Sequence, residues 1–201
     1  MNGKGTQYAV RYRAPGTGYR VPGLGTSMLS AHMALYPIRT FGDPVLRGVA
    51  EPITEVTSAI ERLVDDMLET MYDAPGVGLA APQVGVAKAL FVADVGDGPF
   101  VMVNPEIVET AGEDWVFEEG CLSVPGRFWP IERPGFARAR GLDLDGNPVE
   151  RAGDDMLGRV LQHEIDHLDG ILLLERLPKR VRKAALRDLR REALELDDRR
   201  S

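Results

Sequence analysis

The sequence predicts an α+β protein in which antiparallel β-sheets pack around one central helix, with an N-terminal helix before it and a C-terminal helix after it. Two observations support this class. Short apolar runs separated by glycine and proline turns fill residues 88–150, as in an antiparallel meander. Helix start and stop signals bracket residues 58–73, 155–168 and 178–195. Because the strands follow one another without intervening helices, the pattern does not match a βαβ fold.

The first helix is predicted at residues 58–73. Ser58 and Glu61 match a capping box, in which each side chain satisfies a free backbone N–H at the helix start. Pro75-Gly76 ends this helix. Apolar residues at helical spacing predict a face that packs in the core, formed by Ile60, Leu63, Val64, Met67, Leu68 and Met71.

The strand region begins with a hairpin, in which apolar runs at 89–94 and 100–104 flank the turn sequence Gly96-Asp97-Gly98-Pro99. The series is expected to continue as short antiparallel strands. Further strands are predicted at 107–110, 115–117, 136–140 and 148–151, with turns at Gly112, Pro134-Gly135 and Asp145-Gly146.

In the sequence, a short apolar run separates the second predicted helix from the third. The second helix is capped by Asp154 or Asp155 and ends at Gly170. The apolar residues 171–174 are predicted to form a strand. Pro178 begins the third helix, which has a weak apolar stripe and many basic side chains.

Charge divides the 201-residue chain into three parts. Residues 1–40 contain five basic side chains and no acidic one, residues 41–177 contain ten basic and twenty-six acidic, and residues 178–201 contain nine basic and five acidic. Length and composition predict a flexible, glycine-rich extension at 1–35, one folded domain at 36–177, and a basic helix and tail at 178–201.

The sequence also indicates the cellular compartment of the protein. No apolar run reaches the roughly 18 residues of a membrane span, and the N-terminus lacks the pattern of a secretory signal. The single cysteine, Cys121, excludes an internal disulfide and is typical of a reducing compartment. We therefore predict a cytoplasmic protein. Import into an organelle, which the arginines near the N-terminus would suit, is the alternative.

The central helix contains the sequence His163-Glu164-Ile165-Asp166-His167. Histidines four residues apart lie on one face of a helix, where two neutral imidazoles can share one divalent metal. Glu164 points about 100° away around the helix axis, so it can hold a water beside the metal without binding the metal itself. The central helix is therefore predicted to bind metal. The alternative is an exposed amphipathic helix with two surface histidines, although His32 is the only other histidine in the chain.

A catalytic site of this type requires a third protein ligand. The metzincin proteases have a third histidine six residues after the second, where this chain has Leu173. Thermolysin-like enzymes use a downstream glutamate, for which Glu175 is a weak candidate because it follows Gly170 on a predicted strand. Cys121 is the stronger candidate, because a thiolate binds Fe²⁺ or Zn²⁺ well.

Three stretches together resemble the signature motifs of peptide deformylase, in the same order. They are Gly-Val-Gly-Leu-Ala-Ala-Pro-Gln at 76–83, Glu-Gly-Cys-Leu-Ser at 119–123 and Gln-His-Glu-Ile-Asp-His at 162–167. The resemblance spans about residues 36–177, which would form the peptide deformylase catalytic domain. It implies a bacterial, metal-dependent hydrolase that removes the formyl group from N-formylmethionine of newly synthesised polypeptides and releases formate.

The resemblance also implies roles for individual residues. The metal ligands would be Cys121, His163 and His167, holding one divalent ion, with Fe²⁺ favoured and Zn²⁺ as the alternative. Glu164 would act as general base. The side-chain amide of Gln83 and the backbone N–H of Leu122 would stabilise the oxyanion. No substrate role is carried over to Arg127, because the segment around it varies in the family.

The substrate is expected to bind beside the metal. Val77 and Gly78 lie in a wall of small residues and are candidates for binding the peptide, which we expect to be held as an added strand. Met156, Arg159 and Val160 precede the first ligand histidine by one or two turns and share its helix face, so they are candidates for the methionine pocket. We expect Arg159 to lay its aliphatic stem along this pocket and to send its charge into solvent.

Two other functions remain open. A zinc endopeptidase would need a cleft that holds peptide chain on both sides of the metal. A metal-holding, ribosome-binding protein without activity would have no need of Glu164 or Gln83.

The basic C-terminal helix predicts a contact with ribosomal phosphate. Residues 179–191 carry seven basic side chains and one acidic side chain. Docking of this helix on the acidic body is the alternative. No membrane or DNA partner is expected.

Overall fold

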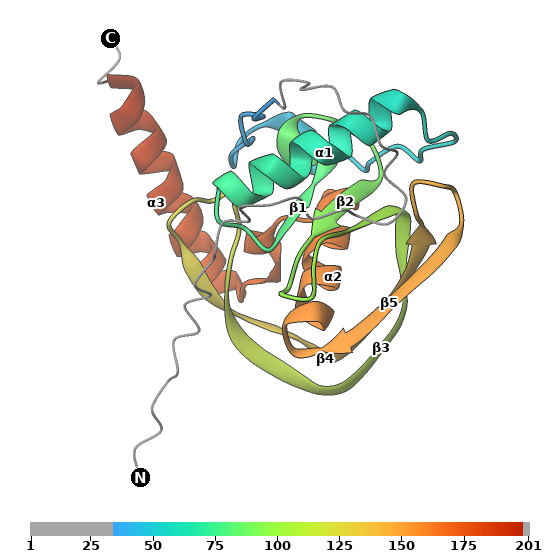
Figure 1. Cartoon of the computed structure of the whole chain (residues 1–201). Helices are drawn as coiled ribbons and strands as arrows, with labels where there is room; N and C mark the ends of the chain where they lie inside the picture. Colours follow the sequence, from blue (N-terminus) through green and yellow to red (C-terminus); the bar gives the residue numbers. More distant parts are fainter. Residues whose placement is uncertain (1–33, 199–201) are drawn as a thin grey trace.

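One antiparallel sheet of five strands curves around the helix α2 (Asp155–Leu168). The computed structural model describes residues 34–198, and Figure 1 shows α2 in the middle of the fold with the sheet around it. The α+β class is confirmed, but the described residues form one sheet where several were predicted. The strands pair in sequence order and are β1 (Gly78–Ala80), β2 (Leu90–Ala93), β3 (Phe100–Gly120), β4 (Phe128–Leu142) and β5 (Pro148–Asp154).

The predicted helices are all present. Helix α1 spans Ser58–Asp73 and α2 spans the predicted range, whereas α3 runs from Lys179 to Asp198, three residues beyond the predicted end. Short 3₁₀ helices connect other elements; they are η1 (Pro44–Arg47), η2 (Ala81–Val84) and η3 (Leu173–Arg176).

Strands β1 and β2 separate two parts of the core. Leu79 and Val92 belong to the apolar cluster that includes α1, whereas Ala80 and Phe91 belong to the cluster that includes α2. Successive side chains of a strand point to opposite faces, so both faces of these strands are buried. This double burial explains why their sequences are continuous apolar runs.

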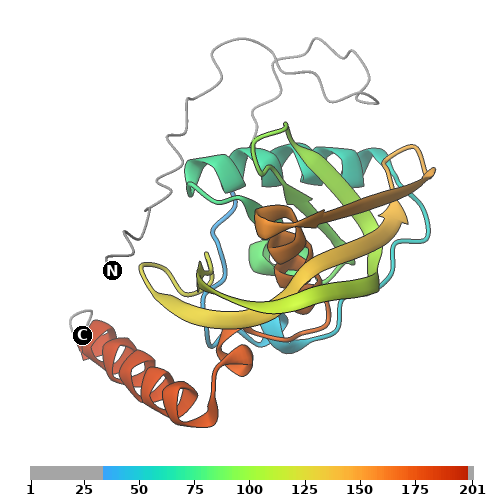
Figure 2. The same cartoon turned by 90° about the horizontal axis from the view of Figure 1, so that it is seen from below.

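The strands β3 and β4 are longer than the sequence predicts, and their ribbon bends around α2 (Figure 2). The predicted turns at Gly112 and Pro134-Gly135 are wrong, because both positions lie inside continuous strands. The pairing register shifts beside Gly112, whose φ of +79° favours glycine. A β-bulge therefore bends the strand where a turn was expected. The hairpin at 96–99 and the turn at Asp145-Gly146 are confirmed.

The helix starts differ in detail from the predictions. The capping box of Ser58 and Glu61 is wrong, because α1 begins at Ser58 itself and Thr57 takes the N-cap position without a side-chain hydrogen bond. Asp154, one of the two predicted alternatives, is the N-cap of α2. Its side chain, like that of Thr57, makes no capping hydrogen bond.

The segment between α2 and α3 is not a strand. The apolar residues 171–174 lead into η3, and Leu172, Leu173 and Leu174 are all buried. Three successive buried side chains suit a tight helical turn between several neighbours better than a strand with one buried face.

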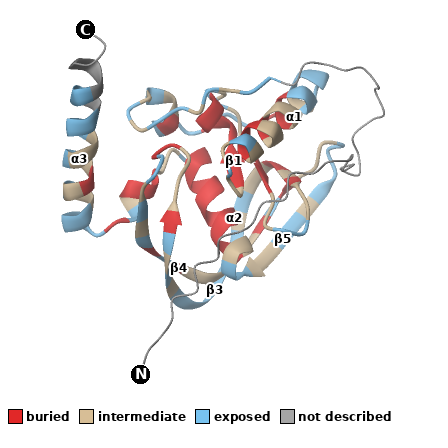
Figure 3. Ribbon diagram, turned by 60° about the vertical axis from the view of Figure 1, so that its left-hand side comes forward, coloured by how far each residue is buried: buried red, intermediate tan, exposed pale blue. Residues whose placement is uncertain are grey.

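Helix α3 contacts the rest of the protein through a short apolar stripe. Ala185 is buried in a cluster with Ile131 and η3, and Leu186 and Leu189 pack against that cluster. Much of the remaining surface of α3 is exposed (Figure 3). None of the helices described in residues 34–198 has the length and apolar character to cross a membrane. The predicted extension at 1–35 lies outside the described residues except for its last two positions.

Candidate metal centre

Helix α2 and the end of β3 bring the three predicted ligands together. His163 and His167 are buried, and their ring centroids lie 5.0 Å apart. Cys121 follows β3 directly and is partly buried. One donor atom from each of the three residues lies within 4.8 Å of the others, and Cys121 Sγ lies 3.1 Å from His167 Nε2. The structure therefore places the three side chains close enough to share one ion.

Glu119 fixes the orientation of His163. Its Oε1 lies 2.6 Å from His163 Nδ1, and its side chain is buried. Burial raises the pKa of Glu119, but hydrogen bonds from His163 and Arg133 outweigh burial, so this pKa lies below its usual range. An anionic Glu119 holds the proton on His163 Nδ1 and leaves Nε2 available to a metal.

Cys121 has the electrostatic surroundings of a thiolate. Burial would raise the pKa of its thiol, but the neighbouring His167 and His163 lower that pKa well below its ordinary value. The backbone N–H of Ser123 also donates toward Cys121 Sγ at 3.4 Å. One thiolate and two imidazoles form a donor set that suits Zn²⁺ or Fe²⁺, so the residues present fit the predicted metal.

Glu164 lies beside the ligands with one oxygen free. Its side chain is 3% exposed, and its Oε2 has no hydrogen-bond partner among residues 34–198. Burial is the main cause that raises the pKa of Glu164 to about 7. Gly78 leaves room for this carboxylate, because a Cβ at position 78 would lie 2.3 Å from Glu164 Oε1. A carboxylate that titrates near neutral pH is well suited to accept and return a proton.

Gln83 points its amide nitrogen toward the thiol. The backbone N–H of Ala80 donates to Gln83 Oε1 at 2.8 Å, which orients the amide group. Gln83 Nε2 then lies 3.3 Å from Ser123 Oγ and 3.7 Å from Cys121 Sγ. Leu122 follows the thiol directly, and within the described residues its backbone N–H donates no hydrogen bond. Both predicted oxyanion donors therefore lie next to the predicted ligand Cys121.

The predicted substrate residues lie in two groups. Gly78 begins β1, which is an edge strand because only β2 pairs with it. Val77 and Met156 pack on the apolar cluster that contains the buried Val160, so these side chains form one continuous apolar region with α2.

Arg159 does not have the predicted orientation. Its side chain is 4% exposed, and Nη1 donates to Glu119 at 2.8 Å while Nη2 donates to the carbonyl oxygen of Trp115 at 2.8 Å. Its guanidinium carbon also lies 4.9 Å from the centre of the Trp115 ring. The prediction that its charge reaches solvent is wrong, because a buried carboxylate attracts the guanidinium inward.

The alternative ligand Glu175 lies elsewhere. It forms ion pairs with Arg47 at 3.2 Å and Arg182 at 3.4 Å, on the outside of η3. The cluster that can hold a metal among residues 34–198 contains Cys121 and not Glu175. Arg127 pairs with Glu192 of α3, so its contact in this structure is with the C-terminal helix.

Sequence reasoning missed Glu119 and Arg133 as part of the site. Glu119 stands in the quoted Glu-Gly-Cys-Leu-Ser motif, but no local spacing predicts that it reaches His163, 44 positions later. Arg133 had no signal in the sequence, since it precedes the predicted turn at Pro134-Gly135, where an arginine is usually exposed.

A thiolate after β3, together with two imidazoles and a free carboxylate on α2, is the arrangement of side chains typical of a metallohydrolase. A model of the polypeptide deformylase family matches residues 35–183, most of the chain. The chain belongs to the polypeptide deformylase family.

Several relatives and solved structures agree with this assignment. The chain is 54% identical to the peptide deformylase of Agathobacter rectalis over 145 residues, which cover 72% of this chain and 91% of the relative. It is 49% identical to that of Clostridium botulinum over 148 residues, covering 74% and 100%. The crystal structure of peptide deformylase from Thermus thermophilus matches with a TM-score of 0.75 and 45% identity, covering 82% of this chain and 98% of that one.

Proposed function

We propose that this protein is a peptide deformylase that removes the N-terminal formyl group of newly synthesised polypeptides and releases formate. Membership of the family supports this activity. The single observation that carries the mechanism is the cluster of Cys121, His163 and His167 with the unpaired Glu164 oxygen beside it. We assign the catalytic domain to residues 36–177, as the sequence predicts.

Cys121, His163 and His167 are the proposed ligands of one divalent ion. When bound, the ion would supply Lewis-acid chemistry that activates water. Fe²⁺ is favoured by the family resemblance, and Zn²⁺ is the alternative, because one thiolate and two imidazoles do not discriminate between them.

Glu164 is the proposed general base and acid. It takes a proton from the attacking water through its free Oε2 and then delivers a proton to the nitrogen of the leaving peptide amine. Water thus adds its hydroxyl to the formyl carbon, the C–N bond breaks, and formate and a free N-terminus result.

Gln83 and Leu122 are the proposed oxyanion donors. The amide nitrogen of Gln83 and the backbone N–H of Leu122 both lie beside Cys121, which supports a role in stabilising negative charge on the formyl oxygen. Because Ala80 holds Gln83 Oε1, the amide nitrogen is already oriented toward Cys121.

Replacing Gln83 with methionine is expected to lower kcat about 10²–10³-fold, since removal of one oxyanion donor has this effect in other hydrolases. Metal content is expected to stay at the wild-type value. Formate release from a formyl-Met peptide measures the effect. Gln162→Met is the control, because Gln162 is also a buried glutamine, but its amide donates to the carbonyl oxygens of Pro134 and Gly158. Equal losses in both variants would contradict the assignment.

The proposed substrate contacts use the open edge of β1 and the apolar region beside α2. The peptide backbone would pair with Val77 and Gly78 as an added strand, which suits substrates of any sequence. Met156 and Val160 would contact the methionine side chain. We assign Arg159 to the support of Glu119 and no longer to the pocket.

The activity is tested by incubating the metal-loaded protein with a formyl-Met peptide and measuring formate, with anaerobic metal analysis of the same sample. Stoichiometric metal and formate release are expected. Cleavage of an internal peptide bond without formate release would support the endopeptidase alternative.

We also propose that α3 attracts the protein to ribosomal phosphate, in the bacterial cytoplasm. Six basic side chains of α3 are exposed, and five of them form no ion pair among residues 34–198, whereas Arg191 pairs with Asp188. The helix contacts the body through other residues. Replacing all five with glutamine should weaken ribosome binding roughly tenfold or more at low salt and reduce its salt dependence, because fewer phosphate counterions are released. The five are Lys179, Arg180, Lys183, Arg187 and Arg190. Co-sedimentation with ribosomes at several salt concentrations measures this.

Deformylation of a free formyl-Met peptide by this variant should stay at the wild-type rate. Unchanged ribosome binding would show that the basic helix has only a structural role.

A further inference from the structure

A chain of ion pairs connects the candidate metal ligand His163 to the protein surface. Arg176 Nε donates to Asp166 Oδ2 at 2.9 Å, and Arg133 Nη1 donates to the same oxygen at 2.8 Å. Arg133 also donates to both oxygens of Glu119, from Nε at 3.0 Å and from Nη2 at 2.7 Å. Glu119 in turn holds His163 Nδ1. We call Arg176, Asp166, Arg133 and Glu119 the ion-pair chain.

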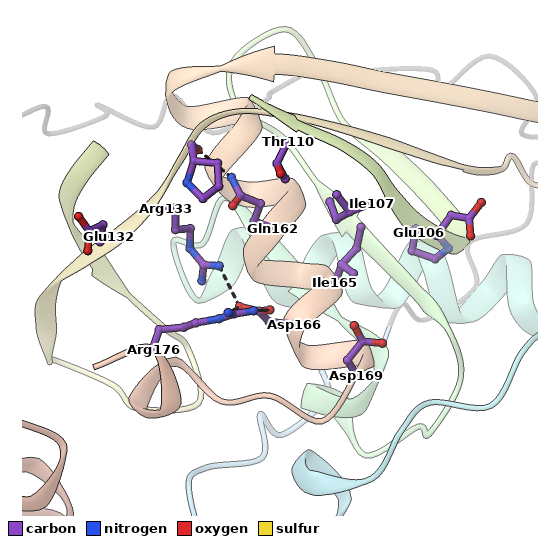
Figure 4. A pocket seen from close by; sticks show the side chains of 12 residues that line it. Glu106, Ile107, Thr110, Glu132, Arg133, Gln162, Ile165, Asp166, Asp169 and Arg176 are labelled. Atoms are coloured by element: carbon purple, nitrogen blue, oxygen red, sulfur yellow. Dashed lines mark hydrogen bonds and ion pairs between the residues drawn. The ribbon is translucent and has the colours of Figure 1, made fainter. Parts of the chain in front are cut away.

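Three members of the ion-pair chain are buried, and the outer member, Arg176, is exposed. The side chains of Arg133, Glu119 and Asp166 are 3%, 6% and 9% exposed, whereas that of Arg176 is 42% exposed. A cavity of about 490 Å³ between α2, β3 and β4 opens beside Asp166, and Figure 4 shows Arg133 and Arg176 converging on this carboxylate. Arg176 is thus the member of the chain that a substitution can reach with least disturbance of the core.

Asp166 lies between the two histidines in sequence but has a different role. The cluster of ligand atoms among residues 34–198 contains both histidines and Cys121, and it does not include Asp166. Its carboxylate instead receives two guanidinium groups, from Arg133 and Arg176. The hydrogen-bonded route from the Asp166 carboxylate to His163 therefore runs through Arg133 and Glu119.

Arg133 is shared between the carboxylates of Asp166 and Glu119. A change at the outer residue Arg176 can therefore alter how Arg133 contacts Glu119. With Arg176 present, Asp166 has two cations and Arg133 can give two of its hydrogen bonds to Glu119. Without Arg176, Arg133 becomes the one cation of the chain that serves both buried carboxylates. A buried carboxylate that loses a partner is costly, so Asp166 would compete with Glu119 for Arg133.

We propose that Arg176 is a positioning residue for the metal ligand His163, acting through Asp166, Arg133 and Glu119. It fixes the Glu119 carboxylate and thereby the ring orientation and tautomer of His163. This inference rests on the metal site proposed above. Arg159 Nη1 also donates to Glu119 Oε2 at 2.8 Å, so removal of Arg176 loosens His163 without releasing it.

The test is the rate at which the zinc-loaded protein releases its metal to an excess of chelator. Loss of a group bound directly to a metal ligand typically costs 10–100-fold in metal affinity, so Arg176→Gln, acting through intermediate residues, is expected to speed release by about 3–10-fold. Arg176→Lys keeps the charge with fewer donors and should restore most of the wild-type rate. The melting temperature of each variant is measured alongside.

Arg182→Gln is the matched control. The Arg182 side chain is 41% exposed, nearly as much as that of Arg176, and it pairs with Glu175 at 3.4 Å outside the ion-pair chain. Its zinc release should equal that of the wild type. If Arg176→Gln releases zinc no faster than Arg182→Gln, the inference is wrong, whatever the change in melting temperature.

A second measurement tests the route. In an Asp166→Asn background, Arg176→Gln should add little to the release rate, because the link between Arg176 and Arg133 is already broken. Fully additive effects would overturn the proposed route. If Asp166→Asn does not fold, the comparison of the Arg176 and Arg182 variants decides alone. A wild-type protein that holds no stoichiometric zinc would instead overturn the proposed metal site.

Discussion

Replacing Glu164 with alanine is expected to lower kcat for formate release by about 10²–10⁴-fold, the usual contribution of a positioned general base. The metal should be retained, because Glu164 is not among the three clustered donor residues. Formate release and metal content, measured on the same preparation, check both parts. Near wild-type turnover would exclude Glu164 as the base.

The Glu164→Ala variant is expected to fold. The pKa of Glu164 is raised from 4.5 to about 7, so the folded state disfavours the charged carboxylate in the metal-free protein. That cost grows as the pH rises from below 4.5 through 7, and alanine removes it. Metal-free Glu164→Ala should therefore be at least as resistant to thermal unfolding as metal-free wild type at pH 8. Glu113→Ala, which removes an exposed carboxylate on β3, is the control. It should change neither the rate of formate release nor the resistance to thermal unfolding.

Replacing Cys121 with serine is expected to weaken metal binding by more than the roughly 10–100-fold that follows loss of a group bound to a ligand. A neutral hydroxyl is a much poorer donor than the thiolate that His167 and His163 favour at this position. Competition with a chelator of known affinity measures the change. Formate release should fall in parallel with the fraction of protein that holds metal.

Glu175→Gln is the matched control for the cysteine variant. Glu175 was the alternative third ligand, but it pairs with Arg47 and Arg182 outside the cluster. This variant should bind metal as the wild type does. Metal loss in Glu175→Gln together with full retention in Cys121→Ser would reverse the ligand assignment.

Local sequence spacing was sufficient to predict α2 and two of the candidate ligands. A separation of four residues places His163 and His167 on one helix face wherever the helix lies in the protein. The helix range was also predictable, because a cap region and Gly170 bound it in the sequence. The choice of Cys121 over Glu175 followed from chemistry and elimination, and the clustering of the three donors agrees with it.

Strand boundaries were harder to predict for a physical reason. Glycine and proline are read as turn signals, but a bulge in a long ribbon uses the same residues. Gly112 therefore continues β3 in the structure, where the sequence predicts a turn. The distinction depends on pairing with β4, which no window of neighbouring residues contains.

The sequence by itself determined the fold class, the helix positions and the pair of candidate histidine ligands, because these depend on residue type and on spacing along one element. Only the tertiary structure decided where charges inside the protein point. Arg159 turns inward and Arg133 is buried because both meet Glu119, and Arg133 also meets Asp166, 33 positions further along the chain. A buried charge is stable only beside its partner, and partners distant in the sequence become neighbours only when β3, β4 and α2 pack together.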